Sequence, residues 1–305
     1  MSAVIEIKKL TKDYGEGRGV FDIDLSIEEG EMVGFAGTNG SGKTTTIRHI
    51  MGFVKPTSGA AYVNGLEAWE HSSEYIRGIG YVPGEIAFPD LATGTAFLKS
   101  QADFLGLKDM SYAEELIKRL QLDPRASLKR MSKGMKQKTA VVAALMADPK
   151  ILILDEPTTV LDPLMRESFL DIIKEEHRKG KTILMSSHMF EELEATCDRV
   201  ALIANGRISH IVDMEDIRNP KVREFKVEFL KREDYERFKT LDFKIVRDQP
   251  EYCQVTVALS GEMTGDLFRA LKGTEVRFIS EVKYNLDKYF REKVVRKKEG
   301  FPHVQ

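Results

Sequence analysis

The segment that most limits what this chain can fold into is a glycine-rich turn, GTNGSGKTT, at residues 37–45. Its glycines allow successive backbone N–H groups to converge on anionic oxygens. The apolar run 32–36 precedes the turn, and a helical pattern over 45–51 follows it. A strand, loop and helix in this order predict a phosphate-binding loop, in preference to a glycine-rich surface turn.

The loop combines backbone donors with two side chains of defined chemistry. Lys43 is expected to hold the β- and γ-phosphates of a nucleotide, and Thr44 is expected to supply a hydroxyl ligand to Mg²⁺. The predicted nucleotide-binding residues of the loop are Gly37, Thr38, Asn39, Gly40, Ser41, Gly42, Lys43, Thr44 and Thr45. The loop alone leaves a GTPase, a kinase and a transporter ATPase open.

Length and composition narrow the class of protein. A chain of 305 residues with 42% apolar residues can form one large domain and a smaller one. With 46 basic and 48 acidic residues, the charge does not call for nucleic acid as a partner. The two cysteines lack CxxC spacing, which argues against a zinc site or a disulfide framework and favours the cytosol. No apolar stretch approaches membrane-spanning length.

Apolar periodicity predicts an α/β protein with a β-rich start. The strands expected before and around the loop are 4–10, 20–27 and 31–36. Helical spacing over 97–120 and 133–146 predicts a helical block. The apolar runs 151–154 and 181–187 each follow a helix-like segment, so we expect parallel buried strands with phosphates at their carboxyl ends.

A composition break at Asn219-Pro220 predicts a second unit. The pattern that follows is β-α-β-β-α-β, the order of a small α+β ferredoxin-like module, with a final charged helix over about 284–296. We therefore predict a domain over 1–217, with a helical subdomain at about 85–148, and a C-terminal accessory domain over 218–305.

Two adjacent carboxylates end one of the predicted parallel strands. Asp155 is expected to hold the Mg²⁺ shell, and Glu156 is expected to polarise the water that attacks the γ-phosphate. An Asp-Glu pair at a strand end is common, so its weight comes from the motifs around it. These are MSKGMKQK at 131–138, VLD at 160–162, and His188 after the strand 182–187.

In this chain order, the motifs closely resemble those of the ATPase domain of ABC transporters, over roughly residues 4–212. The resemblance implies a P-loop ATPase with a mixed sheet core, an antiparallel β subdomain and a helical subdomain. It also implies a head-to-tail dimer of two copies, because this family completes each ATP site with the signature segment of the other subunit.

The resemblance assigns roles to residues outside the loop. Tyr14 is expected to stack on adenine, although a turn tyrosine is the alternative. Ser132 and Gly134 match the signature segment that contacts the γ-phosphate held by the partner. Asp162 matches the loop that bridges the two sites, and His188 matches the histidine that senses the γ-phosphate, with a buried structural histidine as the alternative.

Three positions depart from the family pattern. The family often has Pro at Thr38 and Gly at Lys133, and it usually has Gln at Gly84. That Gln ordinarily reaches Mg²⁺ and the attacking water, while Glu85 is one residue out of register. Lys133 is either solvated, which we favour, or adds positive charge towards the opposing phosphate. The segments PGE and SKG resemble the branch that serves small exporter permeases.

The function implied is an ATP- and Mg²⁺-dependent motor subunit, cytoplasmic and peripheral on the inner face of the cell membrane. It would drive a separate integral membrane permease, docked through the region 84–106, without nucleic acid. The alternatives are a regulatory ATP-binding protein with weak hydrolysis, because of Gly84, and a soluble ABC ATPase outside transport.

Overall fold

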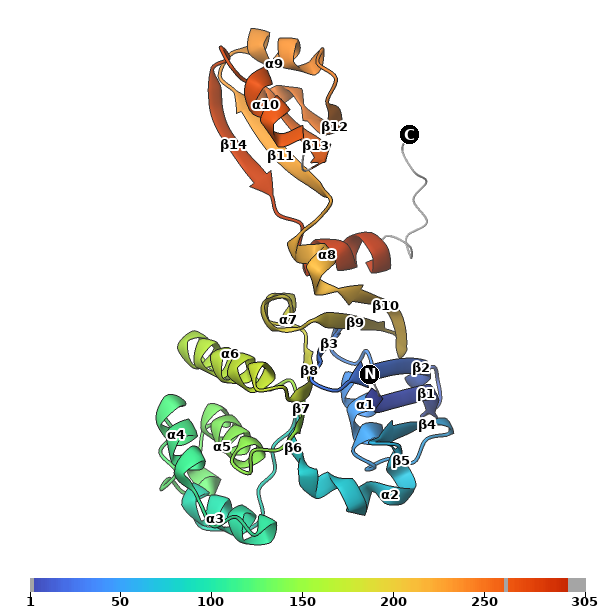
Figure 1. Ribbon diagram of the computed structural model, residues 1–305, viewed down its shortest axis with the longest axis vertical. Helices are drawn as coiled ribbons and strands as arrows, with labels where there is room; N and C mark the ends of the chain where they lie inside the picture. Colours follow the sequence, from blue (N-terminus) through green and yellow to red (C-terminus); the bar gives the residue numbers. More distant parts are fainter. Residues whose placement is uncertain (1–2, 261–262, 296–305) are drawn as a thin grey trace. The chain divides into compact units, whose positions relative to one another are not determined.

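The computed structural model describes residues 3–260 and 263–295 and divides the chain into two compact units (Figure 1). Unit 1 is Met1–Asp213 and unit 2 is Met214–Gln305. Each unit has its own apolar core. Phe35 and Ile153 are buried in the first core, and Val227 and Phe238 are buried in the second.

Unit 1 contains two sheets. A four-stranded sheet has the order β2-β1-β4-β5, and a six-stranded sheet has the order β10-β9-β3-β8-β7-β6. The strands are β1 (Ala3–Asp13), β2 (Gly19–Glu28), β3 (Met32–Ala36), β4 (Ser58–Val63), β5 (Leu66–Glu67), β6 (Ile79–Val82), β7 (Ile151–Asp155), β8 (Thr182–Ser187), β9 (Arg199–Ala204) and β10 (Arg207–Asp213). The smaller sheet is antiparallel, and the larger one is mixed because β10 runs antiparallel to β9. The predicted mixed core and antiparallel subdomain are confirmed.

The central strands β3, β7 and β8 are buried along their whole length, as their mainly apolar sequences favour. All three are parallel, so their carboxyl ends lie at one edge of the sheet. At that edge Ala36 lies opposite Ser187, and Asp155 lies opposite Ser186. This register brings the glycine-rich turn, the carboxylate pair and the segment before His188 to the same place.

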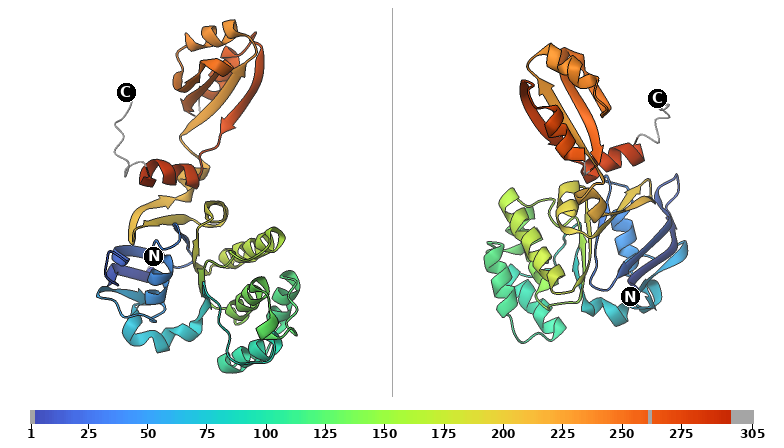
Figure 2. Two further views of the ribbon diagram at one scale, coloured as in Figure 1. Left: turned by 180° about the vertical axis from the view of Figure 1, so that it is seen from behind. Right: turned by 45° about the horizontal axis from the view of Figure 1, so that its top comes forward.

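Some helices of unit 1, among them α6 and α7, lie beside the larger sheet, whereas α3, α4 and α5 form a separate helical block (Figure 2). They are α1 (Lys43–Ile50), α2 (Ala68–Tyr75), α3 (Gly94–Leu105), α4 (Ser111–Arg119), α5 (Lys133–Leu145), α6 (Pro163–Arg178) and α7 (Phe190–Thr196), with 3₁₀ turns at Ile76–Gly78 and Leu128–Arg130. The helical pattern predicted over 97–120 is divided between two helices, α3 and α4. Gly106 adopts φ +69° and ends α3, and a left-handed glycine is a common helix stop.

Unit 2 is built on a four-stranded sheet with the order β12-β13-β11-β14, in which all neighbours are antiparallel. Its elements are α8 (Met214–Arg218), β11 (Val222–Phe229), α9 (Arg232–Lys239), β12 (Lys244–Gln249), a 3₁₀ turn (Pro250–Tyr252), β13 (Gln254–Ser260), α10 (Thr264–Ala270), β14 (Val276–Val282), α11 (Leu286–Phe290) and a π-helical turn (Arg291–Val295). The strands and helices of unit 2 therefore follow one another along the chain in the predicted order β-α-β-β-α-β. The end of the predicted last helix, at residue 296, lies outside the described residues.

Candidate functional site

The glycine-rich turn joins the end of β3 to the start of α1. Gly42 caps α1 with φ +115°, and a Cβ at this position would lie 2.7 Å from the Val20 side chain. A Cβ on Gly37 would lie 2.4 Å from the carbonyl oxygen of Ile203. Both positions therefore require glycine, and the backbone N–H groups at the start of α1 are left to face a ligand.

Lys43 is held in the centre of this turn with only 5% of its side chain exposed. Its Nζ donates hydrogen bonds to the carbonyl oxygens of Gly37, at 2.7 Å, and Thr38, at 3.2 Å. The same Nζ lies 3.1 Å from Oε1 of Glu156. The ammonium group is thus fixed between the loop and the carboxylate that follows β7.

Asp155 is fully buried at the end of β7. Ser186 Oγ donates a 2.6 Å hydrogen bond to Asp155 Oδ1, whereas Oδ2 has no hydrogen-bond partner among the described residues. A buried carboxylate oxygen without a donor is costly unless a cation or its water shell satisfies it. This oxygen, with the Thr44 hydroxyl in the adjacent pocket, fits a hard divalent cation such as Mg²⁺.

Glu156 follows in a left-handed backbone conformation, with φ +50°. Its Oε2 accepts a hydrogen bond from the Thr159 hydroxyl at 3.0 Å and lies 2.7 Å from Nδ1 of His188. Burial opposes ionisation of this carboxyl, but the contact with His188 and the charge of Lys43 outweigh it and hold the pKa of Glu156 below its usual value. The group is therefore a carboxylate at neutral pH.

Lys43, Thr44 and Glu156 line a pocket of about 470 Å³, whereas Asp155 and His188 are not among its lining residues. The predicted site residues that line it are Tyr14, Asn39, Gly40, Ser41, Gly42, Lys43, Thr44, Thr45 and Glu156. The Tyr14 ring is half exposed, and the buried Oγ of Ser41 has no hydrogen-bond partner within the part of the chain that the structure describes. The pocket therefore offers an exposed ring together with a buried hydroxyl that has no partner in the described residues, an arrangement that suits a nucleotide.

The signature residues lie elsewhere on unit 1, at the start of α5. Ser132 caps this helix and accepts a hydrogen bond from the Met135 N–H at 3.2 Å, and Lys133 is exposed. A Cβ on Gly134 would lie 3.1 Å from the Val160 carbonyl, so the segment that precedes Asp162 packs against this helix start. Asp162 in turn caps α6 by accepting from the Met165 N–H at 3.0 Å. Within the described residues, neither signature segment nor Asp162 lines the pocket of its own chain.

Gly84 lies just beyond β6, against the carboxylate of Asp155. A Cβ at this position would lie 3.1 Å from the buried Oδ2 and 3.3 Å from Cγ. Glu85 is exposed, and it is not among the residues that line the nucleotide pocket. The structure therefore brings the backbone at position 84, without a side chain, to the candidate Mg²⁺ ligand.

Comparison with known proteins identifies the family. The ABC transporter family model matches residues 20–159. The bacitracin transport ATP-binding protein BcrA of Bacillus licheniformis is 34% identical over 235 residues, which cover 74% of this chain and 76% of that protein. This chain belongs to the ABC transporter ATP-binding proteins. It is thus an ABC ATPase subunit that binds and hydrolyses ATP.

Other relatives of this ABC ATPase agree. The linearmycin resistance ATP-binding protein LnrL of Bacillus subtilis is 34% identical, with 70% of each chain covered. Among solved structures, an ATP-binding subunit of an ABC transporter matches with a TM-score of 0.64 and 32% identity, covering 70% of this chain and 92% of that one. The dimeric post-hydrolysis state of the ATP-binding cassette MJ0796, bound to ADP and Pi, matches with a TM-score of 0.61 and 25% identity, covering 69% and 98%.

Several residues of this ABC ATPase site were not predicted. Gly17, Arg18 and Asn205 line the nucleotide pocket, and Ser186 positions Asp155. Ser186 could have been suspected, because it stands two residues before His188 at the end of a predicted parallel strand. Gly17 and Arg18 follow Tyr14 in the turn between β1 and β2, and Asn205 lies in the turn between β9 and β10. No motif in the sequence marks these three residues.

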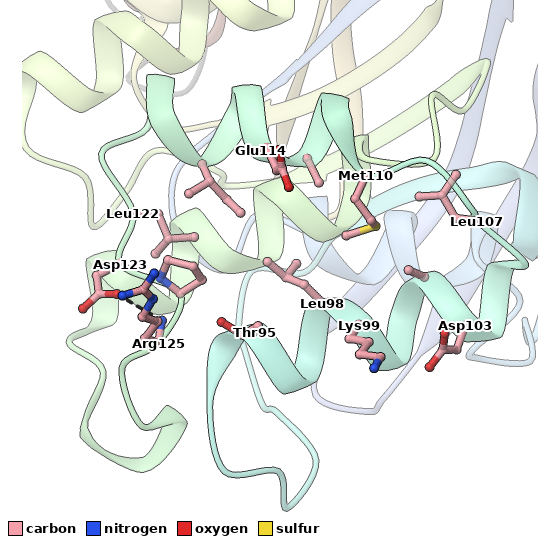
Figure 3. Close-up of a pocket in the computed structure, with 14 residues that line it drawn as sticks. Thr95, Leu98, Lys99, Asp103, Leu107, Met110, Glu114, Leu122, Asp123 and Arg125 are labelled. Carbon is pink, nitrogen blue, oxygen red and sulfur yellow. Dashed lines mark hydrogen bonds between the residues drawn. The ribbon is translucent and has the colours of Figure 1, made fainter.

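Two other hollows lie on unit 1. One, of about 810 Å³, lies between α3 and α4, where Leu98, Met110 and Leu122 face it (Figure 3). No predicted nucleotide-site residue lines it, although its α3 side belongs to the predicted docking region 84–106. The other is a groove of about 410 Å³ beside Pro83 and Ile86, next to Gly84.

Among the helices that the structure describes, none is long and apolar enough to cross a membrane.

Proposed function

We propose that this subunit drives an exporter: two copies bind ATP, close, hydrolyse it and reopen, and so move a separate integral membrane permease. The observation that carries the proposal is the contact chain from Lys43 through Glu156 to His188, which joins the phosphate loop to a carboxylate and a histidine. The names of BcrA and LnrL, a bacitracin transporter subunit and a resistance protein, support an export role.

In the proposed mechanism Glu156 orients and polarises the attacking water. Its lowered pKa keeps it ionised, so it acts mainly through charge and orientation. His188 contacts this carboxylate at 2.7 Å, and its proposed role is to sense the γ-phosphate. Lys43 supplies positive charge to the β- and γ-phosphates, and Tyr14 supplies a ring for adenine.

Thr44 and Asp155 are the residues that we propose hold Mg²⁺. The metal, when bound, neutralises charge on the phosphate oxygens. The buried, unsatisfied Oδ2 of Asp155 supports this assignment, because it is otherwise a desolvated acceptor without a donor in the described part of the chain.

The second copy would complete each site. Ser132, Lys133 and Asp162 are exposed, and Gly134 is half-buried beside them. Donors at a helix start that do not face their own pocket are suited to a γ-phosphate on another subunit. The dimeric MJ0796 cassettes support a dimer.

The groove beside Gly84 is the proposed docking site for the permease. Its lining is apolar and aromatic, including Phe53, Phe88 and Phe104, and Phe104 is well exposed. Such a surface favours a protein partner. We also propose a peripheral location on the cytoplasmic face of the membrane, with no role for nucleic acid.

We further propose that unit 2 is a ferredoxin-like accessory domain that begins near residue 218. The antiparallel order β12-β13-β11-β14, with two helices inserted as β-α-β-β-α-β, supports this fold type. The compact-unit division after Asp213 supports a boundary close to the proposed one.

The test is steady-state ATP hydrolysis by the wild-type protein and Glu156→Gln, each with and without Mg²⁺. We expect Mg²⁺-dependent turnover in the wild type and a loss of about 10²-fold or more in the variant. Equal rates would contradict the motor model and favour a regulatory ATP-binding protein, the alternative that Gly84 suggests. Copurification of a permease with the tagged subunit distinguishes a transporter from an ABC ATPase outside transport.

A further inference from the structure

A buried carboxylate on α7 contacts three segments of the ATPase site at once. Glu192 is 3% exposed, and no motif points to it. Its Oε2 accepts hydrogen bonds from the hydroxyls of Thr158, at 2.8 Å, and Ser187, at 3.0 Å. Arg166 Nε lies 3.3 Å from Oε1, close enough for an ion pair but without the alignment of a hydrogen bond.

The partners of Glu192 are each close in sequence to a site residue. Thr158 stands two residues after Glu156, Ser187 directly precedes His188, and Arg166 lies one helical turn after Asp162. Segments that lie far apart in the chain are therefore joined through one side chain.

The link to His188 is the most direct. The Ser187 hydroxyl donates to Glu192 and accepts a 3.0 Å hydrogen bond from the N–H of Met189. The residues on both sides of His188 are thus tied to the same hydroxyl. His188 Nδ1 must stay 2.7 Å from Glu156 Oε2, and a shift of about 1 Å at a site of this kind can cost about 100-fold in rate.

Removing the Glu192 carboxylate from water costs free energy, and a purely structural contact does not require a charged group. A buried ion pair is often no more stabilising than an apolar group of the same size. A carboxylate with two hydroxyl donors fixes direction as well as distance, which an apolar side chain cannot do. The cost is explained if the orientation of the joined segments matters for the reaction.

We propose that Glu192 is a positioning residue, which acts through Ser187 and Thr158 to hold His188 and Glu156 in register with the start of α6. Glu192 is not among the residues that line the nucleotide pocket. The inference rests on the proposed catalytic roles of Glu156 and His188, and it assigns the geometry of that site to a residue outside it.

The test compares Glu192→Gln with Glu191→Gln in the full-length protein. Glu191 is the exposed neighbour on the same helix, so the control has the same change of charge. We expect Glu192→Gln to lower kcat by about 10- to 100-fold, with KM and the affinity for a fluorescent ATP analogue changed less than about twofold. Glu191→Gln should match the wild type.

A positioning role also predicts non-additivity. In the Glu156→Gln background, the further change Glu192→Gln should lower the residual rate by less than about twofold, because the group that it positions is already disabled. A full additional loss would contradict the inference.

A second pair of variants tests the same contact in case Glu192→Gln does not fold. Thr158→Val removes the hydroxyl with little change of shape, and Thr158→Ser keeps it. The proposal requires a lowered kcat in the first and recovery in the second, with thermal unfolding midpoints within about 4 °C of each other.

The outcomes separate this inference from the proposed function. A wild-type kcat in Glu192→Gln, beside an inactive Glu156→Gln, overturns the positioning role and leaves the motor function intact. Loss of ATP affinity in parallel with kcat also overturns it, because that indicates general damage. Equal rates in the wild type and Glu156→Gln overturn both.

Discussion

At the scale of single residues, the close approach of Gly84 to Asp155 makes a specific prediction. In Gly84→Ala the new Cβ would lie 3.1 Å from Oδ2, tighter than ordinary van der Waals contact, so the carboxylate must shift by a few tenths of an ångström. We expect the Mg²⁺ concentration for half-maximal ATPase activity to rise about three- to tenfold, with Mg²⁺-free binding of ATP unchanged. Gly78→Ala is the matched control, since no heavy atom lies within 4 Å of its Cβ position. An unaltered Mg²⁺ dependence would remove Asp155 from the metal site.

The site residues that could be predicted from the sequence belong to local motifs, whereas those that could not depend on partners elsewhere in the chain. The glycines of the loop, Lys43 and the pair Asp155-Glu156 are local in sequence, so spacing and flanking strands were enough. Ser186 binds Asp155, 31 residues away on a neighbouring strand, and Glu192 binds Thr158, 34 residues away, as well as the nearby Ser187. Serine and glutamate are common residues; the position of Ser186 two residues before His188 is a weak signal, and no motif marks Glu192.

At the scale of elements, the far end of α6 is held to the helical block by a charged cluster. The Tyr112 hydroxyl of α4 donates a 2.7 Å hydrogen bond to the buried Glu176, which also pairs with Lys179 and Lys181. About two turns further along α4, Arg119 donates to both carboxylate oxygens of Glu175 through its two terminal guanidinium nitrogens. Tyr112→Phe should therefore lower the free energy of unfolding by about 1–2 kcal/mol, measured by urea denaturation at pH 7. Tyr252→Phe, at an exposed site, is the control.

The same cluster predicts a pH dependence. Burial of Glu176 raises its pKa, but hydrogen bonds from Lys179, Lys181 and Tyr112 outweigh this, so its folded-state pKa lies below 4.5. A lowered folded pKa adds stability that is complete above about pH 4.5 and is lost as the pH falls through the folded value. Tyr112→Phe should move the acid unfolding midpoint, followed by circular dichroism, to higher pH. An unmoved midpoint would show that this hydrogen bond does not favour the ionised form.

Element types were predicted more reliably than element ends. The apolar spacing over 97–120 continues past Gly106, so periodicity alone could not show that the backbone turns left-handed there and divides two helices. The buried runs at β7 and β8, by contrast, leave few alternatives to parallel core strands. Periodicity reports which face is buried, whereas a helix end depends on one residue's backbone conformation.

At the scale of the whole molecule, separate cores predict separate unfolding. Phe238 is buried in unit 2, stacked on Phe243 and packed against Phe229. We expect Phe238→Ala to destabilise unit 2 by about 3–5 kcal/mol and to leave ATP binding by unit 1 unchanged. Differential scanning calorimetry with and without ATP measures both effects. Phe268→Ala, which truncates an exposed ring, should change neither, and a loss of ATP binding in Phe238→Ala would contradict the independence of the two cores.

Helix α6 mechanically couples Asp162, at its N-terminus, to the helical block that contacts its C-terminal end. Its 16 residues span about 24 Å, from Asp162 at its N-terminus to the contacts with Tyr112 and Arg119 near its C-terminus. A packed helix of this length moves as a rigid body, so a displacement at one end cannot be absorbed along it. If the approach of a second subunit shifts Asp162, the tilt is transmitted to α4 and to the block that carries the signature helix. Each copy would then adjust its own signature segment in response to its neighbour's phosphate.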